Sequence, residues 1–172
     1  QSGITVAHSF DIRERISFYE KLCRSHGALL FEDYEEVKGW MDWLMDTLDS
    51  MERPKCLCHI DANVDNFLFF EDGSVKLLDW EYAGMCDPVM DVSMCAIYSY
   101  YKEEDMERLF RLYLRREPSE DELFALYANA ALGGFLWCLW AVYKSILGDE
   151  FGEYTIIMYR YAKKYYRKLR KL

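Results

Sequence analysis

The first fifty residues carry the spacing of apolar positions that is typical of amphipathic helices. In SFDIRERISFYEKLCRSHG (residues 9–27), apolar side chains recur every three or four positions. Ser9 or Asp11 can cap the start of this segment, and Gly27 can stop it. The segment at residues 31–51 repeats the same spacing. The pattern therefore predicts two helices in the first third of the chain.

The period changes after Pro54, where short apolar runs replace the helical spacing. CLCH (residues 56–59), NFLFF (residues 66–70) and VKLLD (residues 75–79) each have the length of a short strand. An EDG turn separates the last two runs, which is a typical connection in a β-hairpin. This stretch is therefore expected to form small strands that carry loops.

Helical spacing returns after Asp87 and continues to the C-terminus, with breaks expected near Pro118 and Gly148. The chain has 172 residues, of which about half are apolar, and this is the size of one typical domain. The predicted fold class is α+β and predominantly helical, with one small β-hairpin.

The charge of the chain is strongly and unevenly acidic. A net charge of −9 disfavours nucleic acid as a partner and suits a cationic ligand or a metal–nucleotide complex. The last segment, residues 160–172, instead holds seven basic residues and no acidic one. A solvated terminal helix is the favoured interpretation of this segment, and contact with anionic lipid is the alternative.

The six cysteines lie in apolar contexts without a regular framework, so we expect reduced thiols. Cys56, Cys58 and His59 could be considered as zinc ligands. Two cysteines in Cys-x-Cys on a strand share a face, however, and a second ligand pair is missing, which disfavours zinc. No run approaches the roughly 20 apolar residues of a membrane span, and no cleavable signal is visible. The expectation is a cytoplasmic protein without stable membrane insertion.

Polar residues around the predicted hairpin have the spacing of a phosphoryl-transfer site. His59, Asp61 and Asn66 form the pattern H-x-D-x-x-x-x-N, and Asp79 follows at the end of the next strand. Asp61 fits the carboxylate that orients or deprotonates an attacking hydroxyl, while Asn66 and Asp79 fit the ligands of Mg²⁺. His59 belongs to this catalytic motif, where we expect it to brace the loop. The alternative is a polar turn with Asp79 capping the following helix.

The segments HIDANVDNFLF and LLDWEYAG resemble the catalytic loop and the metal-binding segment of the choline kinase and aminoglycoside phosphotransferase superfamily. Asp79-Trp80-Glu81 replaces the Asp-Phe-Gly of protein kinases, and no Arg stands between His59 and Asp61. DPVMDVS and FLWCLWAVYKSILGDEFGEY are most similar to bacterial choline kinases. The resemblance implies a protein-kinase-like fold, with ATP as phosphoryl donor, Mg²⁺ as cofactor and choline as substrate.

Within that family the resemblance covers only one lobe. The sequence contains no Gly-rich phosphate loop and no strand Lys in a V-A-x-K setting, which related kinases carry in an N-terminal nucleotide-binding lobe. We therefore expect residues 1–172 to be the C-terminal lobe, with catalytic and substrate residues, left by truncation or proteolysis and inactive alone. A complete protein that never had the other lobe is the alternative.

Choline offers a hydroxyl to phosphorylate and a quaternary ammonium that only aromatic faces and carboxylates can recognise. Trp137 and Trp140 lie three residues apart on a predicted helix and so share a face. The resemblance to choline kinases implies that this pair forms one wall of the choline site. The alternative is that both rings only pack against neighbouring helices. Glu81 and Tyr82 could add a carboxylate and an aromatic edge, and Tyr154 is a weaker candidate.

Asp91 begins the helix that follows the motif, and by resemblance it braces the catalytic loop from behind, which is a structural role. Three functions stay open from the sequence. The parent protein is a choline kinase, a related kinase of ethanolamine or an aminoglycoside, or a non-catalytic module that binds a quaternary amine.

Overall fold

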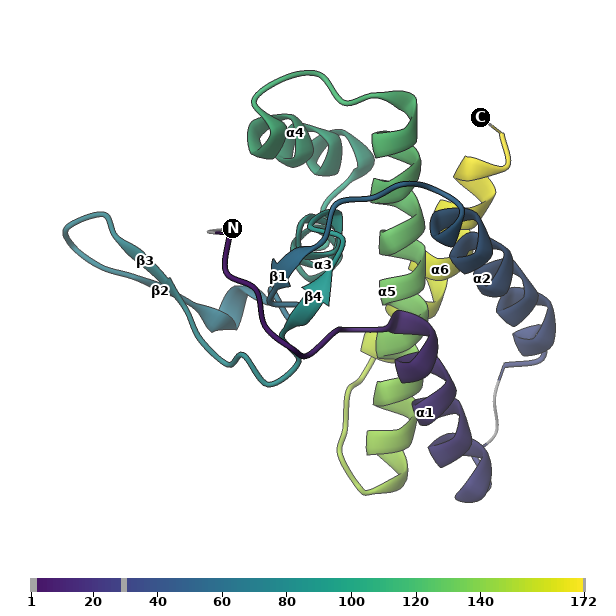
Figure 1. Cartoon of the computed structure of the whole chain (residues 1–172). Helices are drawn as coiled ribbons and strands as arrows, with labels where there is room; N and C mark the ends of the chain where they lie inside the picture. Colours follow the sequence, from purple (N-terminus) through teal and green to yellow (C-terminus); the bar gives the residue numbers. More distant parts are fainter. Residues whose placement is uncertain (1–2, 29–30, 172) are drawn as a thin grey trace. The chain divides into compact units, whose positions relative to one another are not determined.

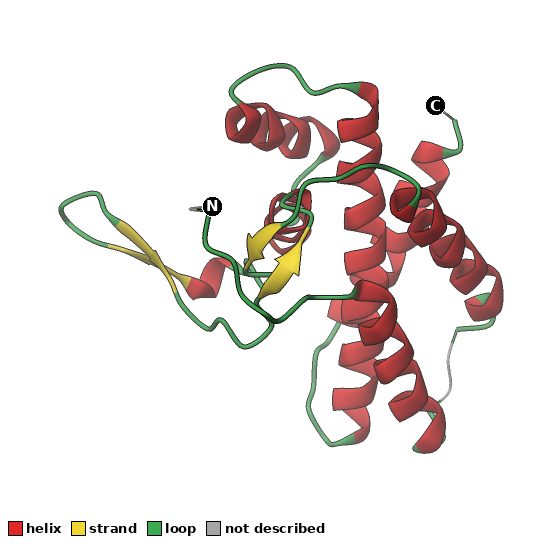
Figure 2. Cartoon of the chain, in the orientation of Figure 1, coloured by secondary structure: helices red, strands yellow, loops and turns green. Residues whose placement is uncertain are grey.

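The computed structural model describes residues 3–28 and 31–171 of the chain, and the fold is predominantly helical (Figures 1 and 2). Two compact units divide the chain between them. One unit consists of Gln1–Phe10 and Arg53–Asn129, and the other of Asp11–Glu52 and Ala130–Leu172. The first unit is called the loop unit below because it holds the candidate catalytic loop, and the second is called the helical unit.

The two predicted N-terminal helices are present in the helical unit as α1 (Ile12–Ser25) and α2 (Tyr34–Asp49). Asp11 is the N-cap of α1, because its Oδ1 accepts hydrogen bonds from the backbone N–H groups of Arg13 at 2.8 Å and Glu14 at 3.1 Å. Gly27 follows the helix with a φ of 70°, a left-handed conformation that ends helices at little cost for glycine. Both ends of the first helix are therefore where the sequence predicted them.

The core of the helical unit forms where α1, α2 and α6 (Tyr154–Leu169) meet the C-terminal part of α5 (Glu120–Ile146). The ring of Trp40 on α2 stacks on that of Tyr166 on α6, with centroids 4.6 Å apart. The thiol of Cys23 on α1 donates to the carbonyl of Leu139 on α5 at 3.3 Å. The buried ring of Phe135 on α5 contacts the buried rings of Tyr34 on α2 and Tyr159 on α6, so all four helices share one core.

The loop unit holds two small antiparallel sheets. In one, β1 (Cys56–Cys58) pairs with β4 (Gly84–Cys86), and in the other, β2 (Phe67–Phe69) pairs with β3 (Val75–Leu77). The β2–β3 pair confirms the predicted hairpin, whose two strands are each two residues shorter than expected. The sequence did not predict β4, because three residues beginning with glycine carry no readable alternation.

The helices of the loop unit are α3 (Val89–Tyr98), α4 (Glu103–Leu114) and the first part of α5. The breaks expected near Pro118 and Gly148 are confirmed. A further break between α3 and α4 was missed, and Tyr100 in it has a φ of 53°. The Ser93 hydroxyl on α3 donates to the carbonyl of Leu126 on α5 at 2.9 Å and holds these two helices together.

The long helix α5 corrects one expectation from the sequence. By length and composition it could cross a membrane, since an 18-residue window has a mean hydropathy of 1.5. The expectation that no run approaches the length of a span is therefore wrong for this helix. Since 83% of that window is buried inside the protein, the apolar side chains of α5 already have protein partners.

The crossing of α5 and α6 depends on a glycine, which gives the first prediction. A Cβ at Gly134 would lie 2.6 Å from the carbonyl oxygen of Met158 and 3.1 Å from the backbone nitrogen of Ala162. Because backbone atoms cannot rotate away, Gly134→Ala should lower the free energy of unfolding in urea by about 1 to 3 kcal/mol.

Gly39, in the middle of α2, is the matched control, since a Cβ there meets nothing within 4 Å. Gly39→Ala should raise the free energy of unfolding by about 0.5 to 1 kcal/mol through helix propensity alone. A similar response of the two variants would show that α5 and α6 do not cross as closely as described.

Candidate active site

The candidate catalytic loop follows β1 and is fixed from behind by Asp91. One carboxylate oxygen of Asp91 accepts the backbone N–H of His59 at 2.9 Å, and the other accepts that of Ile60 at 2.8 Å. Ile60 has a φ of 74°, a conformation that L-residues with a branched Cβ avoid. The two charge-assisted bonds hold this turn, so the bracing role expected of Asp91 is confirmed.

His59 connects the catalytic loop to the segment that carries Asp79. Its Nε2 lies 2.6 Å from the carbonyl oxygen of Leu78, and its ring makes an edge contact with Trp80 at a centroid distance of 4.8 Å. Since a carbonyl only accepts, Nε2 carries the proton. The side chain is buried, and its Nδ1 has no hydrogen-bond partner among the residues the structure describes. This is the geometry of a residue that braces the loop, and direct participation of His59 in catalysis stays a prediction.

Asn66 contacts the candidate base directly. Its Nδ2 donates to the backbone carbonyl of Asp61 at 2.9 Å and to the Asp61 carboxylate oxygen Oδ2 at 3.1 Å. Because the NH₂ group faces Asp61, the amide oxygen of Asn66 lies on the other side of the amide carbon. That oxygen is a hard donor of the kind that Mg²⁺ prefers.

The hairpin brings Asp79 back to this pair. The backbone N–H of Leu78 donates to the carbonyl of Asn66 at 2.9 Å, so Asp79 follows one residue after the position paired with Asn66. Asp79 is exposed and has a φ of 59°, and non-glycine residues in this conformation concentrate at functional sites. The structure therefore brings Asp61, Asn66 and Asp79 to one end of the hairpin.

The oxygen donors at this end fit Mg²⁺ by their chemistry. The candidate ligands are the amide oxygen of Asn66 and the carboxylate of Asp79, and Mg²⁺ retains several waters when few protein ligands are present. In the described ranges, 3–28 and 31–171, no three His, Cys, Asp or Glu side chains cluster as metal ligands. A site of two protein oxygens completed by water and phosphate is the kind that phosphoryl transfer uses.

The thiols next to the loop are reduced and poorly acidic. The Sγ atoms of Cys56 and Cys58 lie 3.6 Å apart, and none of the six cysteines of the chain forms a disulfide. Burial and the neighbouring thiol raise the pKa of Cys56 to about 12. Interaction with Cys86, together with burial, also raises the pKa of Cys58. These thiols are therefore protonated and unreactive at neutral pH.

The predicted substrate-binding residues fall into two groups. Glu81 and Tyr82 belong to the loop unit, in the turn after Asp79, and the Glu81 side chain is exposed. Trp137, Trp140 and Tyr154 belong to the helical unit.

The aromatic group of the helical unit is a chain of ring contacts. Trp137 meets Trp140 edge to face at 5.9 Å, Trp140 meets Phe151 at 5.0 Å, and Phe151 meets Tyr154 at 6.2 Å. Sequence reasoning missed Phe151, although its position three residues before Tyr154 was a usable signal. Trp137 is only 3% exposed and packs in the core, whereas Trp140 is partly exposed. Lys144 Nζ lies 5.9 Å from the Trp140 ring centroid, so this ring already contacts a cation.

Comparison with known proteins agrees with the geometry of the loop. Residues 8–127 match the model of the phosphotransferase enzyme family. The chain is 27% identical over 152 residues to Protein LicA of Haemophilus influenzae, covering 84% of this chain and 41% of that protein. It is 26% identical over 151 residues to Ethanolamine kinase 1 of Mus musculus, covering 72% of this chain and 42% of that protein.

A solved structure extends the likeness to the fold. The choline kinase LicA from Streptococcus pneumoniae superposes with a TM-score of 0.83 at 27% identity, over 97% of this chain and 58% of that one. This chain therefore spans about two fifths of the curated relatives it matches and somewhat more of the solved chain. Its fold is that of the C-terminal lobe of the kinase-like relatives, and the chain belongs to the phosphotransferase enzyme family, in the superfamily that choline kinases share with aminoglycoside phosphotransferases.

Proposed function

We propose that this chain supplies the catalytic loop, the Mg²⁺ ligands and the substrate pocket of an ATP-dependent choline kinase. The observation that carries the proposal is the hydrogen bond between Asn66 and Asp61, made next to a hairpin that returns Asp79 to the same place. Phosphoryl transfer in kinases uses a carboxylate that orients the attacking hydroxyl close to an Asn and an Asp that hold Mg²⁺.

In this mechanism the Asp61 carboxylate orients the substrate hydroxyl and accepts its proton as the hydroxyl oxygen forms a bond to the terminal phosphorus of ATP. The bond from that phosphorus to the bridging oxygen breaks, and the products are phosphocholine and ADP. Bound Mg²⁺ would neutralise charge on the phosphate oxygens. Asn66 restrains Asp61 through its NH₂ group, and its amide oxygen would hold the metal. His59 fixes the backbone immediately before Asp79.

For the substrate pocket we propose Trp140 as the ring that contacts the trimethylammonium group. Its contact with Lys144 supports this role, because a ring face that holds an ammonium can hold choline instead. Lys144 Nζ also lies 3.7 Å from the Asp149 carboxylate, which gives the lysine an alternative partner. Trp137 supports Trp140 from within the core. Tyr154, Glu81 and Tyr82 remain further candidates for substrate contacts.

A kinase of ethanolamine is the second candidate. The exposed carboxylate of Glu81 could accept hydrogen bonds from a primary ammonium, and the murine relative is called an ethanolamine kinase. An aminoglycoside kinase and a non-catalytic module that binds quaternary amines are the remaining alternatives. Turnover with choline, ethanolamine and an aminoglycoside side by side distinguishes all four.

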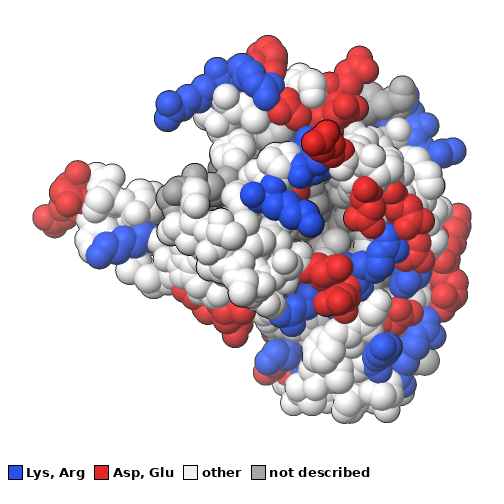
Figure 3. All heavy atoms as spheres, viewed as in Figure 1, with Lys and Arg blue, Asp and Glu red and all other residues white. Residues whose placement is uncertain are grey.

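We further propose that residues 1–172 need a nucleotide-binding lobe for catalysis. The hairpin supports this, since Leu68, Phe69 and Val75 on it are 43%, 78% and 50% exposed. Apart from its acidic tip and one basic group, the hairpin surface is uncharged in Figure 3. Exposed apolar surface of this kind suits contact with another part of an enzyme. We place the complete enzyme in the cytoplasm, where ATP is available.

The first test of this function is the loss of the candidate base and metal ligand in the complete enzyme. Asp61→Asn should lower kcat about 100-fold or more, because the amide cannot accept the hydroxyl proton. Asp79→Ala should abolish use of the magnesium nucleotide. Asp65→Asn, at an exposed carboxylate in the same loop, is the matched control and should retain near-normal turnover. Normal kcat in either of the first two variants would refute the kinase assignment.

The second test separates substrate contact from packing in the aromatic group. Trp140→Leu should raise the KM for choline by roughly 3-fold to 30-fold with little change in the KM for ATP, because it removes a cation–π contact. Trp137→Leu should instead lower the melting temperature. An unchanged choline KM for Trp140→Leu, or a loss that only follows stability, would show that the pocket lies elsewhere.

The third test uses the 172-residue chain alone. It should give a helical circular dichroism spectrum with a cooperative melting transition, since both units have buried cores. It should not form phosphocholine from ATP and choline. A spectrum of an unfolded chain would contradict the first expectation, and steady phosphocholine production would contradict the second.

A further inference from the structure

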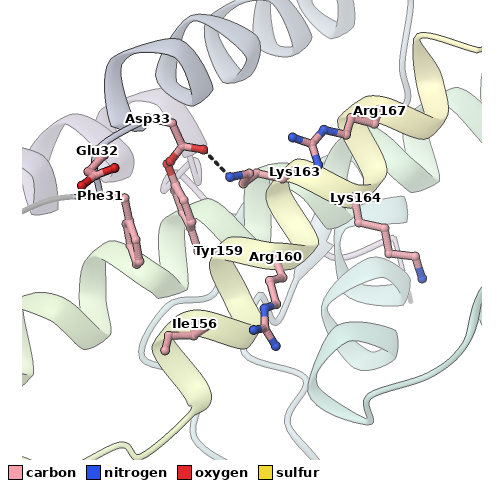
Figure 4. Close-up of a pocket in the computed structure, with 9 residues that line it drawn as sticks. All are labelled: Phe31, Glu32, Asp33, Ile156, Tyr159, Arg160, Lys163, Lys164 and Arg167. Carbon is pink, nitrogen blue, oxygen red and sulfur yellow. Dashed lines mark hydrogen bonds and ion pairs between the residues drawn. The ribbon is translucent and has the colours of Figure 1, made fainter.

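The helical unit contains a pocket that shares no residue with the candidate active site. Figure 4 shows its lining residues, which lie just before α2 and on one face of α6. The pocket has a volume of about 680 Å³. That volume is typical of pockets that bind small molecules. Its walls include four cationic side chains and two carboxylates, as well as the stacked rings of Phe31 and Tyr159, whose centroids lie 3.8 Å apart.

The cations are arranged along one face of α6. Arg160, Lys163, Lys164 and Arg167 stand at helical positions i, i+3, i+4 and i+7, and seven residues of helix span about 10 Å. This excess of positive charge occurs in a chain whose net charge is −9. A pocket whose charge is positive favours anionic ligands, even though the net charge of the protein is negative.

One of the four cations is neutralised inside the protein. Lys163 forms an ion pair with Asp33, shown as the dashed line in Figure 4, and the Tyr159 hydroxyl donates to the same carboxylate at 2.8 Å. The hydrogen bond from Lys163 lowers the pKa of Asp33, which keeps this carboxylate ionised. Lys164 extends away from Asp33. The charge left for a ligand therefore lies mainly on the two arginines.

Arg160 and Arg167 are both exposed and stand on either side of this pair. Neither side chain makes an ion pair or a hydrogen bond with another residue in the described part of the chain, and the Arg167 guanidinium lies 5.6 Å from the Trp40 ring centroid. A guanidinium presents two parallel N–H groups that match the oxygens of a phosphate. Two such groups on one helix face suit a ligand whose negative charge is spread over about 10 Å.

We propose that this pocket binds an anion carrying two or more phosphate groups, held at its ends by Arg160 and Arg167. Because Arg160 and Arg167 stand seven residues apart on the helix, a ligand with more than one phosphate group can contact both guanidinium groups. The ligand is either a free oligophosphate compound or a multiply phosphorylated lipid headgroup, since both present the same chemistry. The proposal does not depend on the choline kinase assignment.

Calorimetric titration of the 172-residue chain with tripolyphosphate tests the proposal. EDTA is present and Mg²⁺ is omitted, so the candidate metal site does not contribute. Saturable binding should weaken about tenfold or more in the double variant Arg160→Gln, Arg167→Gln. Glu32→Gln, which removes an exposed negative charge from the pocket wall, should tighten binding about twofold or threefold.

The matched control is the double variant Lys21→Gln, Lys171→Gln, which removes the same total charge from exposed positions outside the pocket. It should bind tripolyphosphate as the unmodified chain does. Melting temperatures of all variants should agree within a few degrees, because the substituted side chains are exposed.

Flotation with phosphatidylcholine vesicles, with and without phosphatidylinositol bisphosphate, identifies the source of the ligand. Flotation that requires the bisphosphate lipid and both pocket arginines assigns the ligand to a membrane headgroup. Tripolyphosphate binding without such flotation assigns it to a free compound. The absence of both, or an equal loss of binding in the pocket and control variants, overturns the proposal.

Discussion

The catalytic loop depends on the carboxylate of Asp91. A left-handed conformation costs an L-residue about 1 to 2 kcal/mol, and Ile60 adopts it in the middle of the motif. Hydrogen bonds from two adjacent backbone N–H groups to one carboxylate are worth about 1.5 to 3 kcal/mol each, which is enough to offset that cost. Asp91 lies in the first turn of α3, so this helix holds the backbone of His59 and Ile60 in place. The His59 side chain then contacts the carbonyl of Leu78. Asp61, which follows Ile60, contacts Asn66.

Local features of this arrangement could be predicted from the sequence, and non-local ones could not. Asp61 and Asn66 are only five residues apart, and a single hairpin separates Asn66 from Asp79. The spacing of these residues in the sequence was therefore enough to predict that they share a site. β1 pairs with β4 so that Cys56 lies opposite Cys86, thirty residues further along the chain. The sequence of a three-residue strand does not show which other strand it pairs with. The left-handed conformation of Asp79 could not be predicted from the sequence either, since it results from how the hairpin ends.

Helical periodicity shows which side chains share a face but not what covers that face. It correctly predicted that Trp137 and Trp140 would be neighbours, yet it could not show that one ring is buried and the other partly exposed. The same limit applies to the apolar composition of α5. Its hydropathy would suit a membrane span, and only the packing of the surrounding protein shows that most of this surface is already buried.

The basic end of the chain illustrates the difference between formal charge and available charge. Seven basic residues in the last thirteen favoured a solvated terminal helix, with contact to anionic lipid as the alternative. In the structure Lys163 is paired with Asp33, Arg167 lies over Trp40 and Arg170 lies over Trp43, so these cations have distinct environments. Asp33 comes from a segment more than a hundred residues away and could not be assigned to Lys163 from sequence. Contacts made by distant segments thus decide which charges of an amphipathic helix remain able to bind a ligand.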